Sequence, residues 1–256
     1  MPAKDMLMGL SGHSARHYCN YCSARGIYSK KFRHMYAPLT PPTNTPLDPD
    51  WRSYDPNALP LRDHDRSKLY ARHVESTGDT EVIQKTGIKG YSPFWELPSI
   101  VFPWSYGIDS MHLFYLNIAQ YMRDHWAGRF VPSIADEKVN QPYSISTEEW
   151  DNIENDIDRM VFPVAFGDRP RSVFAIRKAA EWRTWLKVIS PIVLKDRLPE
   201  PFYSEWVNLV EAITLATDYS ISRQQLASLH PRFVRVIPRL IGLAFGWLYY
   251  GVWLFG

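Results

Sequence analysis

The pattern of apolar and polar positions predicts a chain built mainly of helices. The clearest helical period follows Gly107, where apolar residues recur every three or four positions: Met111, Phe114, Tyr115, Ile118, Met122 and Trp126. Similar spacing predicts helices over residues 147–160, 173–194 and 203–219, and a shorter helix over 222–229 that ends at Pro231. Pro191 is expected to kink or restart its helix, since proline lacks the backbone N–H.

Local signals sharpen two of these helix starts. Ser146 with Glu149 three positions later is typical of a capping box, so a helix is expected to begin at residue 147. Asp109 and His112 lie one turn apart at the start of the helix after Gly107. Two interpretations of this pair stay open. Either Asp109 caps the helix and His112 is half-buried, or the two side chains share a ligand or a proton.

Proline and aromatic residues dominate the stretch before that helix, which reads GIKGYSPFWELPSIVFPWSYGID over residues 87–109. Each proline fixes its own φ and pushes the preceding residue out of the helical region, so an extended backbone with rings inserted into a core is expected. Residues 37–85 are rich in proline and charge. They predict loops and one short helix over 63–76, with Leu69 and Val74 facing inward and its histidines facing solvent.

Composition adds bounds on size and charge. The chain has 256 residues, 45% of them hydrophobic and 14% aromatic, which is enough for a substantial core. Its formal net charge is only +2, but residues 1–36 hold six Lys or Arg and one Asp, whereas residues 147–160 hold six acids and one Arg. The first block is suited to a phosphate backbone, and the second resembles the solvated face of a helix.

The two cysteines, Cys19 and Cys22, form a C-x-x-C motif. Two cysteines cannot build a disulfide framework, so a reducing compartment is favoured. Thiolates at this spacing clamp Zn²⁺ when imidazoles complete the site, and His34 follows twelve residues after Cys22, with His13 and His17 just before the motif. A redox pair and two inert buried thiols remain the alternatives.

Five blocks occur in the order GHSARHYCNYC, RHMY, GIKGYSPFWELPSIVFPWSYGIDSMHLFYLNI, KAAEWRTWL and SPIVLKDRLP. Together they resemble the transposase of CACTA-type (En/Spm-like) DNA transposons, in the Plavaka form of fungal genomes, over about residues 2–228. The resemblance implies the helical insertion region of a ribonuclease-H-like transposase, mainly α, with a small N-terminal zinc-knuckle-like segment and long Pro-rich loops. The full-length family holds two Mg²⁺ on an acidic triad for strand cleavage and joining.

The chain departs from the family at both ends. The family's two catalytic Asp residues have no counterpart here, since Asp5 does not match, and the catalytic Glu has no match in residues 240–256. We therefore expect a truncated transposase-like protein without independent strand-transfer activity and without a small-molecule substrate. The alternatives are a zinc-dependent DNA-binding module and a tail-anchored membrane protein.

The resemblance also implies roles for individual residues. It assigns zinc to Cys19 and Cys22, with His34 as third ligand and His112 as fourth, and it matches Asp109 and His112 to the family's D-x-x-H motif. Transposon-end DNA is the implied partner. The residues that we expect to contact its backbone are the cations of the first block: Arg16, Arg25, Lys30, Lys31 and Arg33.

The expected organisation has four segments. Residues 1–36 form the zinc-type segment, 37–86 a Pro-rich and charged connection, 87–230 the helical transposase-like domain, and 231–256 an apolar tail foreign to the family. Residues 240–256 carry no charge but are short for a span of about 20 residues. A nuclear or cytoplasmic location is expected, with membrane attachment through 240–256 as the alternative.

Overall fold

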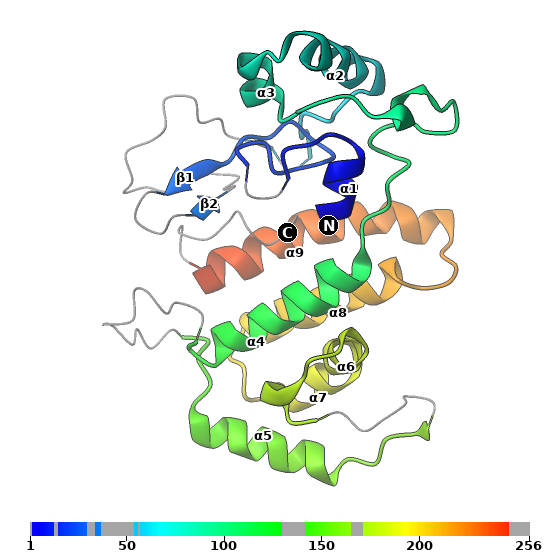
Figure 1. The fold of residues 1–256 in the computed structure, drawn as a ribbon. Coiled ribbons are helices and arrows are strands. Elements are labelled where there is room, and N and C mark those ends of the chain that lie inside the picture. The colour runs from blue at the N-terminus through cyan, green and yellow to red at the C-terminus, as the bar shows by residue number, and fades with distance from the viewer. Residues whose placement is uncertain are drawn as a thin grey trace. The chain divides into compact units, whose positions relative to one another are not determined.

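The computed structural model of the chain describes residues 2–12, 15–29, 34–36, 54–55, 57–129, 142–164 and 171–245 (Figure 1). Over these ranges the chain is mainly helical, which confirms the prediction of a mainly α protein. The described residues form two compact units: the first ends at Asp109 and the second begins at Ser110. This boundary lies inside residues 87–230, which the sequence pattern groups as one domain.

The first unit combines short helices, one strand pair and long loops. Its elements are α1 (Pro2–Leu7), β1 (Ile27–Ser29), β2 (His34–Tyr36), α2 (His64–Thr77), α3 (Thr80–Thr86) and the 3-10 helix η1 (Pro93–Glu96). Strands β1 and β2 are antiparallel, with Ile27 opposite Tyr36 and Ser29 opposite His34.

The proline-rich stretch supplies the core of the first unit, as its rings predict. Trp95 and Phe102 are each 1% exposed, and their ring centroids lie 5.0 Å apart in an edge-on contact. They pack in one cluster with four other buried residues: Met8, Leu10, Ala71 and Ile88. Trp104 differs from this expectation, because it lies beyond the buried segment and is 60% exposed.

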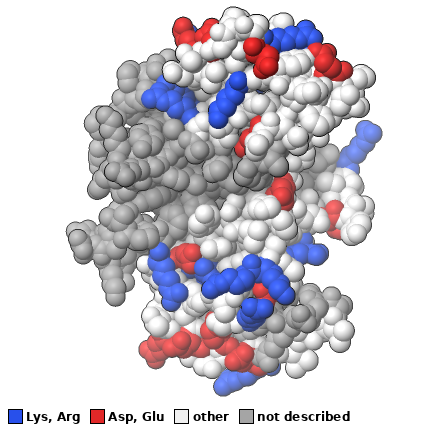
Figure 2. Space-filling model, in the orientation of Figure 1, with Lys and Arg blue, Asp and Glu red and all other residues white. Residues whose placement is uncertain are grey.

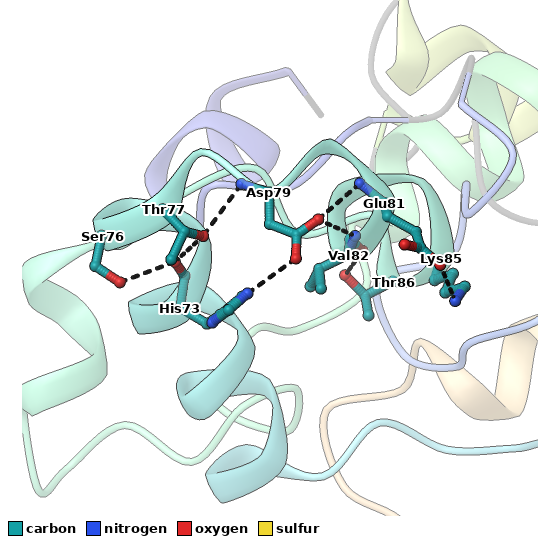
Figure 3. A network of polar contacts seen from close by, with 8 residues as sticks. All are labelled: His73, Ser76, Thr77, Asp79, Glu81, Val82, Lys85 and Thr86. Atoms are coloured by element: carbon teal, nitrogen blue, oxygen red, sulfur yellow. Dashed lines mark hydrogen bonds and ion pairs between the residues drawn. The ribbon is translucent and has the colours of Figure 1, made fainter.

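Helices α2 and α3 meet at a turn that carries its own polar network (Figure 3). Asp79 accepts hydrogen bonds from the backbone N–H groups of Glu81 and Val82, which caps α3, and its other carboxylate oxygen lies 3.0 Å from Nε2 of His73. His73 is therefore engaged by an acid at the surface, although solvent exposure alone was expected. Leu69 was expected inside but is exposed, because α2 buries the face that carries Ala71 and Val74.

The regular elements described in the second unit are all helices, joined by turns and loops. Its elements are the π-helix η2 (Met111–Ala119), α4 (Gln120–Trp126), α5 (Thr147–Arg159), the 3-10 helix η4 (Val173–Ala175), α6 (Ala179–Thr184), the π-helix η5 (Trp185–Ile189), α7 (Ser190–Val193), α8 (Phe202–Ala216) and α9 (Arg223–Phe245). The predicted cap of α5 is present, since Ser146 Oγ accepts from the Glu149 N–H at 3.1 Å.

Tryptophan rings form the centre of the second unit. Trp126 at the end of α4 meets Trp206 of α8 edge-on, with 4.8 Å between ring centroids. The indole N–H of Trp206 donates to Ser190 Oγ at 2.9 Å, and the Ser190 hydroxyl donates to the carbonyl of Leu186. The ring contact and the hydrogen bonds of these buried side chains join α4, α7 and α8 in one core.

The two prolines of the predicted helices have different outcomes. The helix type changes from π to α next to Pro191, which agrees with the expected restart, whereas Pro231 does not end its helix. Helix α6 continues through η5 into α7 past Pro191, and the wide π-turn directly before that proline relieves the clash of its ring with the preceding turn. Helix α9 does not end at Pro231 but runs to Phe245 beside α8 (Figure 1). Phe233 stacks on Phe114 at 6.1 Å and Val236 is fully buried, so tertiary packing outweighs the local penalty of the proline.

The predicted tail, residues 231–256, has two parts: residues 231–245 belong to α9, and the rest lies outside the described ranges. Residues 231–236 belong to α9 and pack within the second unit, so this part is not a loosely attached extension. Residues 246–256 lie outside the described ranges. None of the described helices is long and apolar enough to cross a membrane.

The buried His125 of α4 predicts a pH dependence of stability. Burial lowers its pKa from 6.5 to about 3, so the folded chain keeps it neutral where the unfolded chain binds a proton. This contribution is complete above pH 6.5 and is lost as the pH falls toward 3. The loss is expected to be at most about 1.4 kcal/mol per pH unit.

Urea unfolding measured from about pH 7 down to about pH 4 tests this, with His125→Gln as the comparison. The substituted chain should lose less stability over that interval than the parent chain. Equal losses in the two chains would contradict the assignment of this dependence to His125.

Candidate functional site

The C-x-x-C motif lies in the loop between α1 and β1. Cys19 and Cys22 are each 1% exposed and free of disulfide bonding, and they cluster with buried Tyr18 and Ala24. Asp5 of α1 holds one edge of the loop, because its Oδ1 accepts from Asn20 Nδ2 at 2.9 Å. Both sulfurs are therefore shielded from bulk water.

The Cys19 sulfur is surrounded by hydrogen-bond donors. The backbone N–H groups of Tyr21 and Cys22 both donate to it at 3.3 Å, and the Cys22 thiol donates to it as well. The hydrogen bond from Cys22 is the largest cause that lowers the pKa of Cys19, to about 7, and the backbone donors add to it. The same hydrogen bond and burial raise the pKa of Cys22. One sulfur of the pair is thus prepared to be a thiolate.

A strand-like pairing brings Arg62 beside the cysteine loop. Cys22 forms an antiparallel bridge with Leu61, and the N–H of Arg62 donates to the carbonyl of Tyr21 at 2.8 Å. The Arg62 side chain then turns inward: Nε donates to the Cys19 carbonyl at 3.1 Å and Nη1 to the Thr86 carbonyl at 2.8 Å. The guanidinium therefore connects the cysteine loop to the C-terminal end of α3.

Arg62 is a buried cation, only 8% exposed. Among the described residues it forms no ion pair with a carboxylate, and its Nη2 has no hydrogen-bond partner there. Burial lowers the pKa of Arg62, and its nearness to Cys19 and Cys22 opposes that shift. Because a buried charge is costly without an opposite charge, a Cys19 thiolate is the anion that this arrangement favours.

Gly87 permits the close approach of α3 to the cysteine loop. It is the C-cap of α3 with φ +71°, and a Cβ at this position would lie 2.7 Å from the Cβ of His17. Any other L-residue would meet both backbone strain and this contact. Burial, followed by the nearby Arg62, lowers the pKa of His17, which therefore stays neutral in this position.

The expected zinc ligands are only partly placed by the structure. No group of three or more His, Cys, Asp or Glu suited to a metal ion occurs among the described residues. His34 belongs to β2, opposite Ser29, but its side chain lies outside the described part, as does all of His13. His112 belongs to η2 in the second unit. The described residues thus fit the sulfur half of a tetrahedral zinc site.

Of the other predicted site residues, some lie within the described ranges and some outside them. Asp109 is half-buried and directly precedes Ser110, which is the N-cap residue of η2, so its expected capping role stays a prediction. Arg16 is exposed and Arg25 half-buried in the loops around the cysteine motif. Lys30, Lys31 and Arg33 lie outside the described residues.

Sequence reasoning missed Arg62. It is the first charged residue of a run with many Lys, Arg, Asp and Glu, where the ordinary expectation is a solvated side chain. The only local hint is its place directly after the apolar Leu59-Pro60-Leu61 segment, which pairs with the cysteine loop.

A pair of close, buried sulfurs with backbone donors and an adjacent fixed cation can hold a soft metal ion as thiolates or form a disulfide under oxidation. No protein-family model, curated protein or solved structure matches the chain. The resemblance to CACTA-type transposases therefore stays a prediction that rests on the sequence blocks alone.

The two carbonyl contacts of Arg62 predict a stability effect. Arg62→Lys keeps the charge but cannot reach both carbonyls with the same planar fork, so it should lower the free energy of unfolding by about 1.5 to 3 kcal/mol. The exposed Arg66→Lys is the matched control, with an expected change within about 0.5 kcal/mol. Urea unfolding measures both. Equal stability of Arg62→Lys and the parent chain would contradict the bridging role.

Proposed function

We propose that this chain is a transposase-derived, zinc-binding module that contacts DNA and does not catalyse strand transfer by itself. The observation that carries the proposal is the buried Arg62 beside two close cysteines, because a fixed cation and two backbone donors favour a thiolate at Cys19. Thiolates are the form in which cysteines bind zinc. The five sequence blocks supply the link to a transposase.

Within this proposal, Cys19 and Cys22 provide the sulfur ligands and an imidazole from His34 is the third ligand, with His13 and His17 as the further candidates. The site would fix the fold of the basic first block and so present Arg16 and Arg25 to phosphate groups. Redox exchange between the two thiols is the second candidate function. The hydrogen bond between the two thiols and the Cys19 pKa of about 7 favour it.

Zinc content tests the proposal directly. Chain expressed in zinc-supplied medium should carry about one Zn²⁺, measured by elemental analysis, and Cys19→Ser should lose it. Ser23→Ala, which changes an exposed hydroxyl close to the motif, is the matched control and should keep the metal. A folded parent chain without stoichiometric zinc would overturn the proposal, and a disulfide formed reversibly in that chain would favour the redox function.

The expected lack of strand-transfer activity is tested in a separate experiment. Two-metal strand transfer needs carboxylates that hold metals about 4 Å apart, and the family's acids have no match in this sequence. The isolated chain, incubated with Mg²⁺ and duplex DNA, is therefore expected to leave the DNA intact on a denaturing gel. Nicking that depends on Mg²⁺ and disappears in Asp109→Asn would show that the chain carries a catalytic set.

A further inference from the structure

Basic side chains in the second unit gather on one region. Figure 2 shows blue side chains over α6 and the end of α4, whereas red side chains follow α5. Three arginines from two segments converge there on the ring and backbone around η4: Arg123, Arg129 and Arg177. None of them belongs to the basic first block.

Arg123 holds the ring of Phe174 in place, and this ring is called the platform below. Arg123 is buried, pairs with Asp124 at 2.6 Å and donates from Nη1 to the Val173 carbonyl at 3.1 Å. Its guanidinium lies 5.2 Å from the ring centroid of Phe174 and 5.0 Å from that of Trp182. Helix α4, η4 and α6 are therefore held together, and Phe174 is kept in a fixed position.

Arg129 and Arg177 use this platform at the surface. The guanidinium of the exposed Arg129 lies 4.0 Å from the ring centroid of Phe174, so that one face is covered by the ring while its in-plane N–H groups stay available. Arg177, also exposed, donates from Nη1 to the carbonyls of Phe174 and Ile176 at 3.4 and 3.2 Å. Both side chains are thus oriented without using all their donors.

The acids close to these arginines are already engaged. Asp124 is paired with Arg123, and Glu181 accepts from Arg171 at 3.3 Å and from the N–H of Lys178 at 3.0 Å. Among the described residues, no carboxylate forms an ion pair with Arg129 or Arg177. Burial lowers the pKa of Arg123, Asp124 opposes that shift, and the nearby charges of Arg129 and Arg177 lower the pKa further.

We propose that Arg129 and Arg177, oriented around Phe174, form a binding site for the phosphodiester backbone of double-stranded DNA. Guanidinium groups bind phosphate oxygens in a bidentate manner, and stacking on an aromatic ring reduces the entropy lost on binding. The donors lie on an exposed surface instead of converging in a cavity, which suits a repeated phosphate chain better than a small anion. This surface is separate from the cysteine loop and adds a second DNA contact to the chain.

The test uses the full chain and a labelled random-sequence duplex of about 20 base pairs, titrated by fluorescence anisotropy at several salt concentrations. The double substitution Arg129→Gln/Arg177→Gln should weaken binding at least about tenfold at low salt and reduce the slope of log K against log salt by about 1.8. Arg66→Gln/Arg72→Gln removes the same charge from exposed positions of the first unit. It is the matched control and should change affinity less than about twofold.

Arg129→Lys refines the result, because it keeps the charge but loses the planar stack on Phe174. It should weaken binding about two- to fivefold with an unchanged salt slope. Three outcomes would overturn the proposal: unchanged affinity of the Arg129/Arg177 chain, equal loss in the control chain, or displacement of DNA by poly-glutamate as effective as by unlabelled duplex at equal charge. Loss of binding only in Arg16→Gln/Arg25→Gln would also overturn it while leaving the proposed function intact.

Discussion

The buried guanidinium of Arg62 is the constraint on which the first unit's site depends. It donates to the carbonyls of Cys19 and Thr86 and so joins the cysteine loop to the end of α3. Because no carboxylate of the described residues forms an ion pair with it, a Cys19 thiolate is the anion that this arrangement favours. Shielding, backbone donors and a fixed charge thus act on the same atom.

The second unit depends on aromatic packing, and its surface chemistry follows from that core. In the interior, Trp206 packs against the ring of Trp126 and donates a hydrogen bond to Ser190. Toward the surface the ring of Phe174 packs edge-on against Trp150. The guanidinium groups of Arg123 and Arg129 lie against the same ring. A rigid ring therefore sets the direction of flexible cations. Because the ring fixes the arginines in one region, a chain with a net charge near zero can still have a locally positive surface.

Parts of the fold followed from local sequence signals. The helix over 147–159 begins at the predicted Ser146 cap and buries the apolar positions Trp150, Ile153 and Ile157, because caps and helical periodicity act within one or two turns. The helix over 202–216 agrees with its apolar spacing for the same reason. Pro231 was misjudged because the local cost of a proline was not weighed against contacts made by Phe233 and Val236. Such contacts join residues that are far apart in the chain.

By itself, the sequence determined the mainly helical class, the apolar faces of the helices and the presence of a close cysteine pair, since each depends on neighbours within a few residues. The tertiary structure alone decided that Arg62 turns inward to Cys19, that Trp104 stays exposed while Trp95 is buried, and that Arg129 lies over the ring of Phe174 while Arg177 donates to its carbonyl. The reason is physical. A charge or a ring acquires its role from groups that the fold brings near it, and residue type and spacing carry no information about those groups.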